Sequence, residues 1–164
     1  MMNKRLLADI IATWFGSGLS PKGPGTAGSL ATLPLAIVLS YWTGFFGIMF
    51  VSIVFFAIGV WATDIVISET NDKDPSKVVI DETVGQILTF SLVSPYLLLN
   101  MSYWWIYPLG FVLFRFFDIK KMGLVKHFDK RHDAWGVMLD DVIAGINASI
   151  VLCVICYFVV KFFY

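Results

Sequence analysis

Six carboxylate side chains stand where polar segments of this sequence border long apolar ones. They are Asp81, Glu82, Asp118, Asp129, Asp140 and Asp141. A carboxylate in such a position is costly unless a cation or a metal ion offsets its charge. Oxygen ligands from several segments, with no cysteine and few histidines among them, suit a hard cation such as Mg²⁺. The six residues are therefore predicted to be metal ligands.

Four of the six form adjacent pairs, Asp81 with Glu82 and Asp140 with Asp141. Neighbouring residues of a helix point about 100° apart. We therefore expect each pair to send one carboxylate to a shared centre and the other to a second metal ion or to a Lys or Arg. An ordinary alternative exists for Asp81 and Glu82, because acidic residues in the first turn of a helix offset its dipole.

Two basic residues accompany the carboxylates. Arg115 precedes Asp118 by three residues, which places both on one helical face, and Lys121 follows. Lys and Arg can hold phosphoryl oxygens while a metal ion neutralises charge and activates water. The alternative for Arg115 and Asp118 is a helix-face ion pair worth a few tenths of a kcal/mol. The predicted catalytic residues are Asp81, Asp118, Asp141, Arg115 and Lys121.

A glycine-rich segment, residues 16–29, precedes the first long apolar run and contains five glycines and two prolines. The free N–H groups and the dipole of a helix N-terminus form an anion site, and glycine lets the backbone approach a phosphate closely. Thr26 or Ser29 is expected to cap that helix. A plain entry turn into a membrane helix is the alternative. The predicted phosphate-binding residues are Gly25, Thr26, Gly28, Ser29, Arg115 and Lys121.

These groups together suit the hydrolysis of a phosphate ester. A metal-activated water is the preferred nucleophile, and an Asp nucleophile stays open. The sequence contains no Cys-x5-Arg loop, and Asp72 and Asp74 lack the apolar strand that an aspartate-nucleophile phosphatase needs before them. Cys153 and Cys156 lie inside an apolar stretch without histidine nearby, so neither zinc nor a catalytic thiol is indicated.

The charge distribution indicates which segments must position these residues. Of 24 charged residues, 23 fall in three windows, residues 1–22, 64–82 and 115–141. A helical crossing needs about 20 apolar residues. The uncharged stretch 142–160 therefore matches one span, and the stretch 23–63 suits a hairpin of two. The stretch 83–114 is interrupted by polar residues and proline, which favours two short, tilted or re-entrant passes.

The sequence thus predicts an all-α, polytopic membrane protein with about four to five spanning or re-entrant helices and its polar loops on one face. We expect a single domain over residues 1–164, with residues 1–15 forming an amphipathic helix on the membrane. Eleven of the twelve basic residues would share one side, which the positive-inside rule makes cytoplasmic. A compact helical bundle is the alternative. Zero net charge argues against a nucleic-acid partner.

The sequence resembles the phosphatidylglycerophosphatase A family of bacterial membrane enzymes. The matching blocks occur in family order between residues 15 and 145. They are Phe15-Gly16-Ser17-Gly18 through Pro24-Gly25-Thr26-Ala27-Gly28-Ser29, Val79-Ile80-Asp81-Glu82 with Gly85, Phe114-Arg115 to Asp118 and Lys121, Phe128-Asp129, and Gly136-Val137-Met138-Leu139-Asp140-Asp141 to Ala144-Gly145. Each block is weak by itself, and the set is specific.

The resemblance implies a Mg²⁺-dependent phosphatase of the bacterial inner membrane that converts phosphatidylglycerophosphate to phosphatidylglycerol, with its active site facing the cytoplasm. Two positions depart from the family pattern, Met122 after Lys121 and Asp133-Ala134 where two glycines are common. The second departure leaves open how the loop before Met138 is shaped. It also adds a carboxylate that family members do not always have.

Other functions are considered beside this one. The nearest is a membrane phosphatase that acts on a different phospholipid. A cation or phosphate transporter would also gather carboxylates beside its spans, but transporters bind near the bilayer midplane, where this sequence has no charge. A non-catalytic membrane scaffold would not need so many carboxylates at the boundary.

Overall fold

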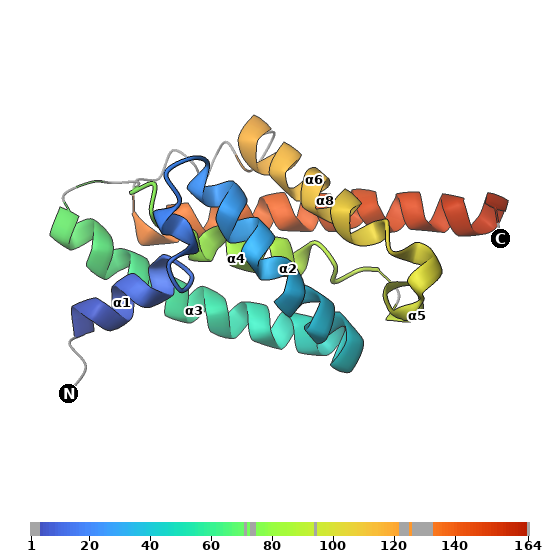
Figure 1. Cartoon of the computed structure of the whole chain (residues 1–164), viewed down its shortest axis with the longest axis horizontal. Helices are drawn as coiled ribbons and strands as arrows, with labels where there is room; N and C mark the ends of the chain where they lie inside the picture. The colour runs from blue at the N-terminus through green and yellow to red at the C-terminus, as the bar shows by residue number, and fades with distance from the viewer. Residues whose placement is uncertain are drawn as a thin grey trace.

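The computed structural model describes residues 4–70, 72, 75–93, 95–121, 125 and 133–163, and these residues lie in helices, turns and irregular segments (Figure 1). The helices are α1 (Lys4–Ala12), α2 (Pro24–Trp42), α3 (Gly44–Thr70), α4 (Ile80–Leu88), α5 (Pro95–Leu99), α6 (Ile106–Lys120) and α8 (Ala134–Phe163). Short 3-10 helices cover Ser17–Leu19 and Met101–Tyr103. The predicted all-α fold is confirmed.

Three of these helices, α2, α3 and α8, are long and apolar enough to cross a membrane. The predicted hairpin over residues 23–63 is α2 and α3, joined at Thr43 and at Gly44, whose φ of 59° favours glycine. The predicted single span at 142–160 lies within α8. Large apolar side chains of α3 and α8 are exposed, with Phe46 84% and Phe158 50% accessible. Such surfaces fit a helical membrane protein better than a compact soluble bundle.

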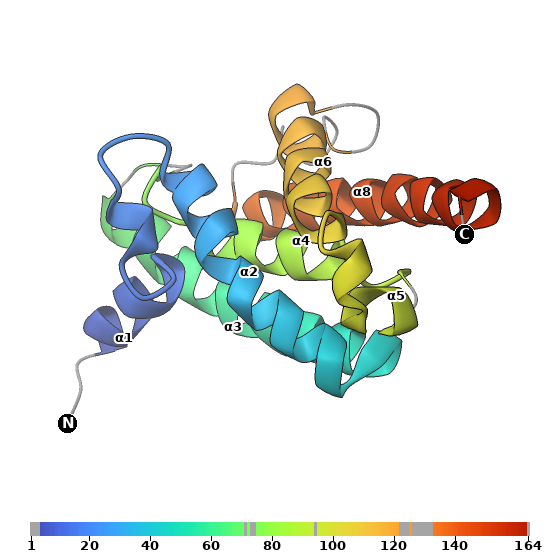
Figure 2. The same ribbon diagram turned by 45° about the vertical axis from the view of Figure 1, so that its right-hand side comes forward.

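Helix α4 lies at the centre of the molecule, between α2, α3, α6 and α8 (Figure 2). Its nine residues span about 14 Å at 1.5 Å per residue, too little to cross a bilayer. Every residue of α4 except Glu82 is buried. Irregular backbone at membrane depth is tolerated where protein covers it. Accordingly, the Leu92 N–H beyond α4 donates to the Ser149 hydroxyl at 3.1 Å. The stretch 83–114 therefore runs through most of α4, the short α5 and the first part of α6. Whether these passes cross the membrane or are re-entrant stays a prediction.

Two glycines allow α4 and α8 to cross at close range. A Cβ atom built at Gly145 would overlap the carbonyl oxygen of Gly85. A Cβ atom at Gly85 would meet the carbonyl oxygen of Asp141 at 2.6 Å and the ring of Phe114. Only glycine fits at these contacts without a shift of the backbone. The crossing therefore sets the distance between the start of α4 and the acidic part of α8.

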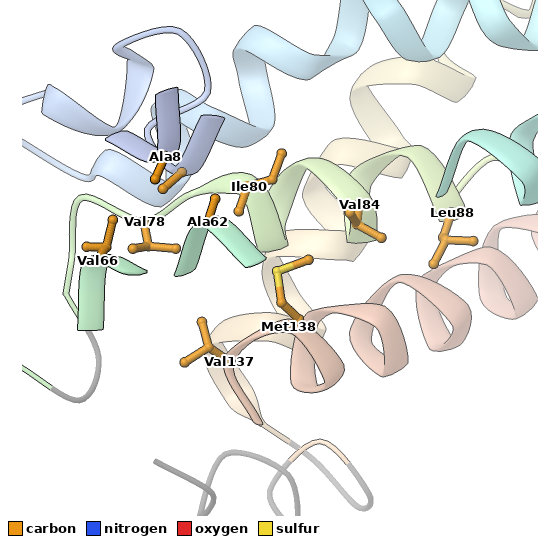
Figure 3. Packing of buried hydrophobic residues seen from close by; sticks show 10 residues of the cluster. Ala8, Ala62, Val66, Val78, Ile80, Val84, Leu88, Val137 and Met138 are labelled. Atoms are coloured by element: carbon orange, nitrogen blue, oxygen red, sulfur yellow. The ribbon is translucent and has the colours of Figure 1, made fainter. Parts of the chain in front are cut away.

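A hydrophobic cluster supports the start of α4 (Figure 3). Its buried members come from α1, α3, α4 and α8 and from the segment before α4; they include Ala8, Ala62, Val66, Val78, Ile80, Val84, Leu88, Val137 and Met138. Two ion pairs tie α1 to its neighbours, Lys77 to Asp9 at 2.7 Å and Arg5 to Glu69 at 3.0 Å. The N-terminal helix is thus part of the packed structure. Whether it also lies on a membrane surface stays a prediction.

The charged ends of the helices lie together. The beginnings of α2, α4 and α8 and the end of α3 lie away from the α2–α3 turn, α5 and the C-terminus (Figure 1). The end of α6 joins them through the Arg115 side chain, which contacts Glu82 of α4. This arrangement agrees with the expectation that the polar loops share one face.

Candidate active site

Carboxylates from α4 and α8 converge at the start of α4. One oxygen atom each from Asp81, Glu82 and Asp141 lies within 4.8 Å of the others. Asp81 and Asp141 are buried, with 8% and 3% of their surface exposed. The Asp118 carboxyl of α6 neighbours that of Asp141 and is paired with Arg115. Four of the six predicted metal ligands are therefore brought together, although they span sixty residues of sequence.

Arg115 of α6 flanks this cluster. Its guanidinium forms an ion pair with Asp118 one turn away and lies 3.8 Å from Glu82 Oε1. The Arg115 side chain is 17% exposed, and its Nη1 is the atom that contacts both Asp118 and Glu82. Its Nε has no hydrogen-bond partner within the described part of the chain. The predicted helix-face pair is present, and it also holds a cation beside the carboxylates of α4. An Nε donor in this position is suited to binding a phosphoryl oxygen.

The second adjacent pair is divided between two partners. Asp141 belongs to the cluster, whereas Asp140 Oδ2 accepts a hydrogen bond from Lys121 Nζ at 3.1 Å. Lys121 ends α6 in the left-handed region at φ 44°, which turns the chain away from the helix axis. The predicted division of a pair between the shared centre and a cation is confirmed here. At the other pair both Asp81 and Glu82 lie in the cluster, and Glu82 also meets a cation, Arg115, at 3.8 Å.

The first turn of α2 meets the cluster through Gly25. A Cβ atom at Gly25 would overlap Glu82 Oε1 and would lie 3.1 Å from Arg115 Nη1. The first backbone hydrogen bond of α2 runs from the Ala27 N–H to the Gly23 carbonyl at 3.0 Å. The N–H groups of Gly25 and Thr26 therefore precede the helical hydrogen-bond series. They place the positive end of the helix dipole next to Glu82 and Arg115.

The other predicted members of the glycine-rich site lie elsewhere. Gly28 packs against Val79, whose Cβ would be 2.7 Å from an added Cβ atom. The Ser29 hydroxyl is buried and donates to the Gly25 carbonyl at 2.8 Å. Thr26 is exposed in the first turn. The prediction that Thr26 or Ser29 caps α2 is wrong, because Gly23 in the left-handed conformation is the N-cap and Pro24 begins the helix.

The remaining predictions concern the loop before α8. Asp129 lies outside the described residues. Asp133 Oδ1 accepts the Gly136 N–H at 2.8 Å, while its carbonyl accepts the Val137 N–H at 3.1 Å. Asp133 is therefore a helix cap for α8. This gives the departure from the family pattern at Asp133 a structural role.

Burial and crowding disfavour charge on the α4 carboxylates. Burial, followed by the neighbouring Glu82 carboxylate, raises the pKa of Asp81 well above its usual range. Burial also raises the pKa of Glu82 to about 8, because the favourable effect of Arg115 is smaller. Glu82 Oε2 has no hydrogen-bond partner among the described residues. Both carboxylates therefore lack full compensation by the groups around them.

Sequence reasoning assigned no role to three residues that help to form this site. Gly85 and Gly145 belong to the family blocks, but only the contact between α4 and α8 gives them a function. Gln86 follows Glu82 by one turn, is fully buried, and has no partner for either side-chain polar atom within the described residues. Its position in an apolar-looking run gave no signal in the sequence.

The fold and the site define a class of protein. It is an all-helical membrane protein whose carboxylates and cations meet at the start of a short, central helix, beside the N-terminus of a second helix. The chain belongs to the phosphatidylglycerophosphatase A family, whose sequence profile matches residues 10–156. It is accordingly a phosphatase, which decides against the transporter and scaffold alternatives.

Curated relatives agree with this family. A Bacteroides thetaiotaomicron protein named "Putative phosphatidylinositol-3-phosphatase" is 35% identical over 94% of this chain and 96% of its own length. The "Phosphatidylglycerophosphatase A" of Haemophilus influenzae is 34% identical over 90% of this chain and 88% of its own. The Escherichia coli protein of the same name is 32% identical over 87% and 80%, respectively. No solved structure was found to match the chain.

Proposed function

We propose that this protein hydrolyses phosphatidylglycerophosphate to phosphatidylglycerol and inorganic phosphate with the help of Mg²⁺. The observation that carries the proposal is the convergence of Asp81, Glu82 and Asp141 within 4.8 Å, beside Arg115. Two relatives with full-length similarity bear the name of this activity. A metal ion held by this buried group of acids, next to the Arg115 guanidinium, would fit a phosphate monoester that arrives with its own negative charge.

The residues of the cluster fit a divalent cation. Their ligand atoms are carboxylate oxygens from two helices, which is the donor type that Mg²⁺ prefers. The orphaned, buried Glu82 Oε2 is a further acceptor that a cation would satisfy. We propose Asp81, Glu82 and Asp141 as ligands, with Asp118 beside them. When bound, the metal ion would neutralise phosphoryl charge and activate water.

The chain's own groups would orient the substrate. Arg115 offers its Nε to a phosphoryl oxygen, and the ion pair of its Nη1 with Asp118 fixes the direction of the guanidinium. The N–H groups of Gly25 and Thr26 supply further donors from the start of α2. Attack of water on phosphorus breaks the ester P–O bond. The proton that the water releases goes to a carboxylate of the cluster, and the leaving alkoxide takes up a proton to give the lipid alcohol.

We also propose that the site faces the cytoplasm at the inner membrane of a bacterium. Among the described basic residues, Arg5, Lys77, Arg115 and Lys121 form ion pairs with acids. Eleven of the twelve basic residues of the sequence precede the last apolar stretch. The positive-inside rule favours the cytoplasm for the side that carries them. Substrate would then diffuse to the site within the inner leaflet.

A second substrate deserves direct comparison, because a relative of equal similarity is named for phosphatidylinositol 3-phosphate. The two lipids share one structural unit. In each, the phosphate monoester and the phosphodiester sit on carbons that are separated by a single hydroxyl-bearing carbon. A site that contacts only this unit would accept both lipids. A site that contacts the whole headgroup would distinguish glycerol from inositol.

The decisive experiment measures phosphate release by purified protein from dioleoyl phosphatidylglycerophosphate and from dioleoyl phosphatidylinositol 3-phosphate in mixed micelles. We expect release from phosphatidylglycerophosphate, loss of release with a chelator, and restoration when Mg²⁺ is added back. Faster release from phosphatidylinositol 3-phosphate would make that lipid the preferred substrate in place of phosphatidylglycerophosphate. Full activity in the presence of the chelator would refute the metal requirement and leave the phosphatase assignment intact.

A further inference from the structure

An apolar groove lies between α3, α4 and α8, on the side of α4 away from Arg115. Its volume is about 410 Å³. Met49 and Ile53 contribute from α3, Val84 from α4, and Val142 and Ile146 from α8. Since α3 and α8 are candidate membrane spans, the groove lies among the segments that contact lipid.

The groove continues from the candidate active site. Val84 follows Asp81 by three residues and therefore lies on the same face of α4, one turn further along. On α8, Leu139 and Val142 flank the pair Asp140 and Asp141, and both line the groove. Val84 and Leu88 point from α4 toward α8 (Figure 3), and both line the groove. A molecule bound at the carboxylates would have this groove as its next neighbour toward the interior of the membrane.

The polar groups along the α4–α8 side of the groove are already occupied. The Ser149 hydroxyl accepts the Leu92 N–H at 3.1 Å and lies 3.3 Å from the Ser91 hydroxyl. Ser52 of α3 also lines the groove, and its buried hydroxyl has no hydrogen-bond partner among the described residues. The other lining side chains are aliphatic, aromatic or methionine. This surface offers few hydrogen-bonding groups to a polar ligand. A hydrocarbon chain bound here would cover the apolar side chains of the groove.

We propose that this groove binds one acyl chain of the phospholipid substrate and so fixes the lipid relative to the carboxylates. The inference rests on the proposed function insofar as the substrate is a phospholipid. A lipid whose headgroup enters the site must place its chains beside the same helices, and this groove is the apolar surface that continues from the carboxylates. The chain would then contribute to recognition and would orient the phosphate, since binding energy remote from the reacting bond can position the reacting group.

The test fills the groove from either wall. Ile146→Trp and Ile53→Trp each add a bulky ring at positions that are 43% and 63% exposed, so both variants should fold. Ile150→Trp is the matched control, one turn further along α8, 49% exposed and not part of the groove. Activity is measured on dioleoyl and on dihexanoyl phosphatidylglycerophosphate, because the short chains barely reach into the groove.

We expect both groove variants to raise KM for the dioleoyl lipid about tenfold or more, the order of effect of a misfit in a hydrophobic pocket. Activity on the dihexanoyl lipid should stay near that of the wild type, and Ile150→Trp should change neither. Equal effects of groove and control variants, or none, would overturn the proposal. If the wild type is a dimer and a groove variant is a monomer with wild-type kinetics, the groove binds a second copy of the chain. That result would also overturn the proposal.

A binding measurement keeps this inference separate from the catalytic one. A phosphatidylglycerol analogue with a photoreactive acyl terminus, incorporated in nanodiscs, should cross-link to the groove walls in the wild type. Cross-links there should fall in Ile146→Trp and persist in Ile150→Trp. Labelling that simply follows lipid exposure, for example at Phe46 and Phe158, would refute the groove even in a fully active phosphatase. Cross-linking in the groove with no phosphate release would retain the groove and reject the proposed reaction.

Discussion

The two adjacent carboxylate pairs of this protein have different surroundings. On α8, Asp141 joins the cluster while Asp140 is neutralised by Lys121 at 3.1 Å. On α4, both Asp81 and Glu82 lie in the cluster, and the nearest cation, Arg115, is 3.8 Å from Glu82 and paired more closely with Asp118. The α8 pair is therefore largely balanced by protein groups, whereas the α4 pair is not.

This difference indicates where the protein relies on a ligand. A buried carboxylate without a partner is costly, and the unpaired oxygen of Glu82 adds to that cost. The α4 pair should then depend on metal and substrate for compensation, while Asp140 and Lys121 should chiefly hold the end of α6 against α8. Substitutions at the two pairs can test this division of roles.

The largest effects are expected at the shared centre. Asp81→Asn, Asp141→Asn and Asp118→Asn keep the size of each side chain and remove the charge that binds a divalent cation. Each should reduce Mg²⁺-dependent phosphate release about a hundredfold or more, which corresponds to about 2.7 kcal/mol at 1.36 kcal/mol per decade. Expression and membrane insertion should be unchanged, as judged by yield and gel filtration in detergent.

If these aspartates only stabilised helix ends, each change would cost about 0.3–1 kcal/mol of stability and little turnover. Near-wild-type kcat in all three variants would therefore reject the site. Loss of activity that is restored by higher Mg²⁺ concentration would support the role as ligands.

A smaller effect is expected where α2 approaches the α4 pair. Gly25→Ala introduces a Cβ atom that overlaps Glu82 Oε1, whereas Gly28→Ala introduces one against Val79. Gly25→Ala should reduce kcat/KM about tenfold or more, because small displacements of reacting groups are costly. Gly28→Ala should lower the melting temperature more than it lowers activity. Equal loss of activity at both positions with unchanged stability would instead support a phosphate contact at each, as the glycine-rich pattern predicts.

The balanced pair should tolerate substitution better. Asp140→Asn and Lys121→Ala should each reduce kcat/KM by about tenfold or less, because the Lys121 side chain is 33% exposed and its ion pair is partly screened. The double variant should lose little more than either single one, since the two residues act through one contact. An effect of Asp140→Asn as large as that of Asp141→Asn would remove the distinction between the two halves of this pair.

The smallest effect concerns pH and the stability of chelator-treated protein. Burial raises the pKa of Glu82 from 4.5 to about 8, so the folded protein binds a proton that the unfolded chain releases. Stability is therefore highest below about pH 4.5 with respect to this group and falls as pH rises toward 8. The slope is at most about 1.36 kcal/mol per pH unit for one proton.

Scanning fluorimetry between pH 5 and pH 8.5 can measure this effect. The melting temperature of chelated wild-type protein should fall with pH, and Glu82→Gln should flatten the curve. Added Mg²⁺ should stabilise the protein more at pH 8 than at pH 6, because binding displaces protons. A wild-type curve as flat as that of Glu82→Gln would show that Glu82 is already ionised in the folded protein.

Several features were predictable from the sequence because they depend on composition and local spacing. The uncharged stretches give the α2–α3 hairpin and the α8 span, since the length of an apolar helix is matched to the bilayer. The order of motif blocks gives the family. The carboxylates at the boundaries and the helical spacing of Arg115 and Asp118 give the type of chemistry. None of these requires knowledge of which helices touch.

The tertiary structure decided which of these residues meet. Whether a carboxylate faces the cluster or a lysine depends on the rotation and crossing of α4 and α8, which Gly85 and Gly145 set through a backbone contact. The sequence predicts the same division for both acidic pairs, but α8 divides its pair and α4 does not. The approach of Gly25 to Glu82 is likewise a contact between helices that are far apart in the sequence. Contacts between distant segments depend on how the helices pack, and a local sequence pattern does not predict them.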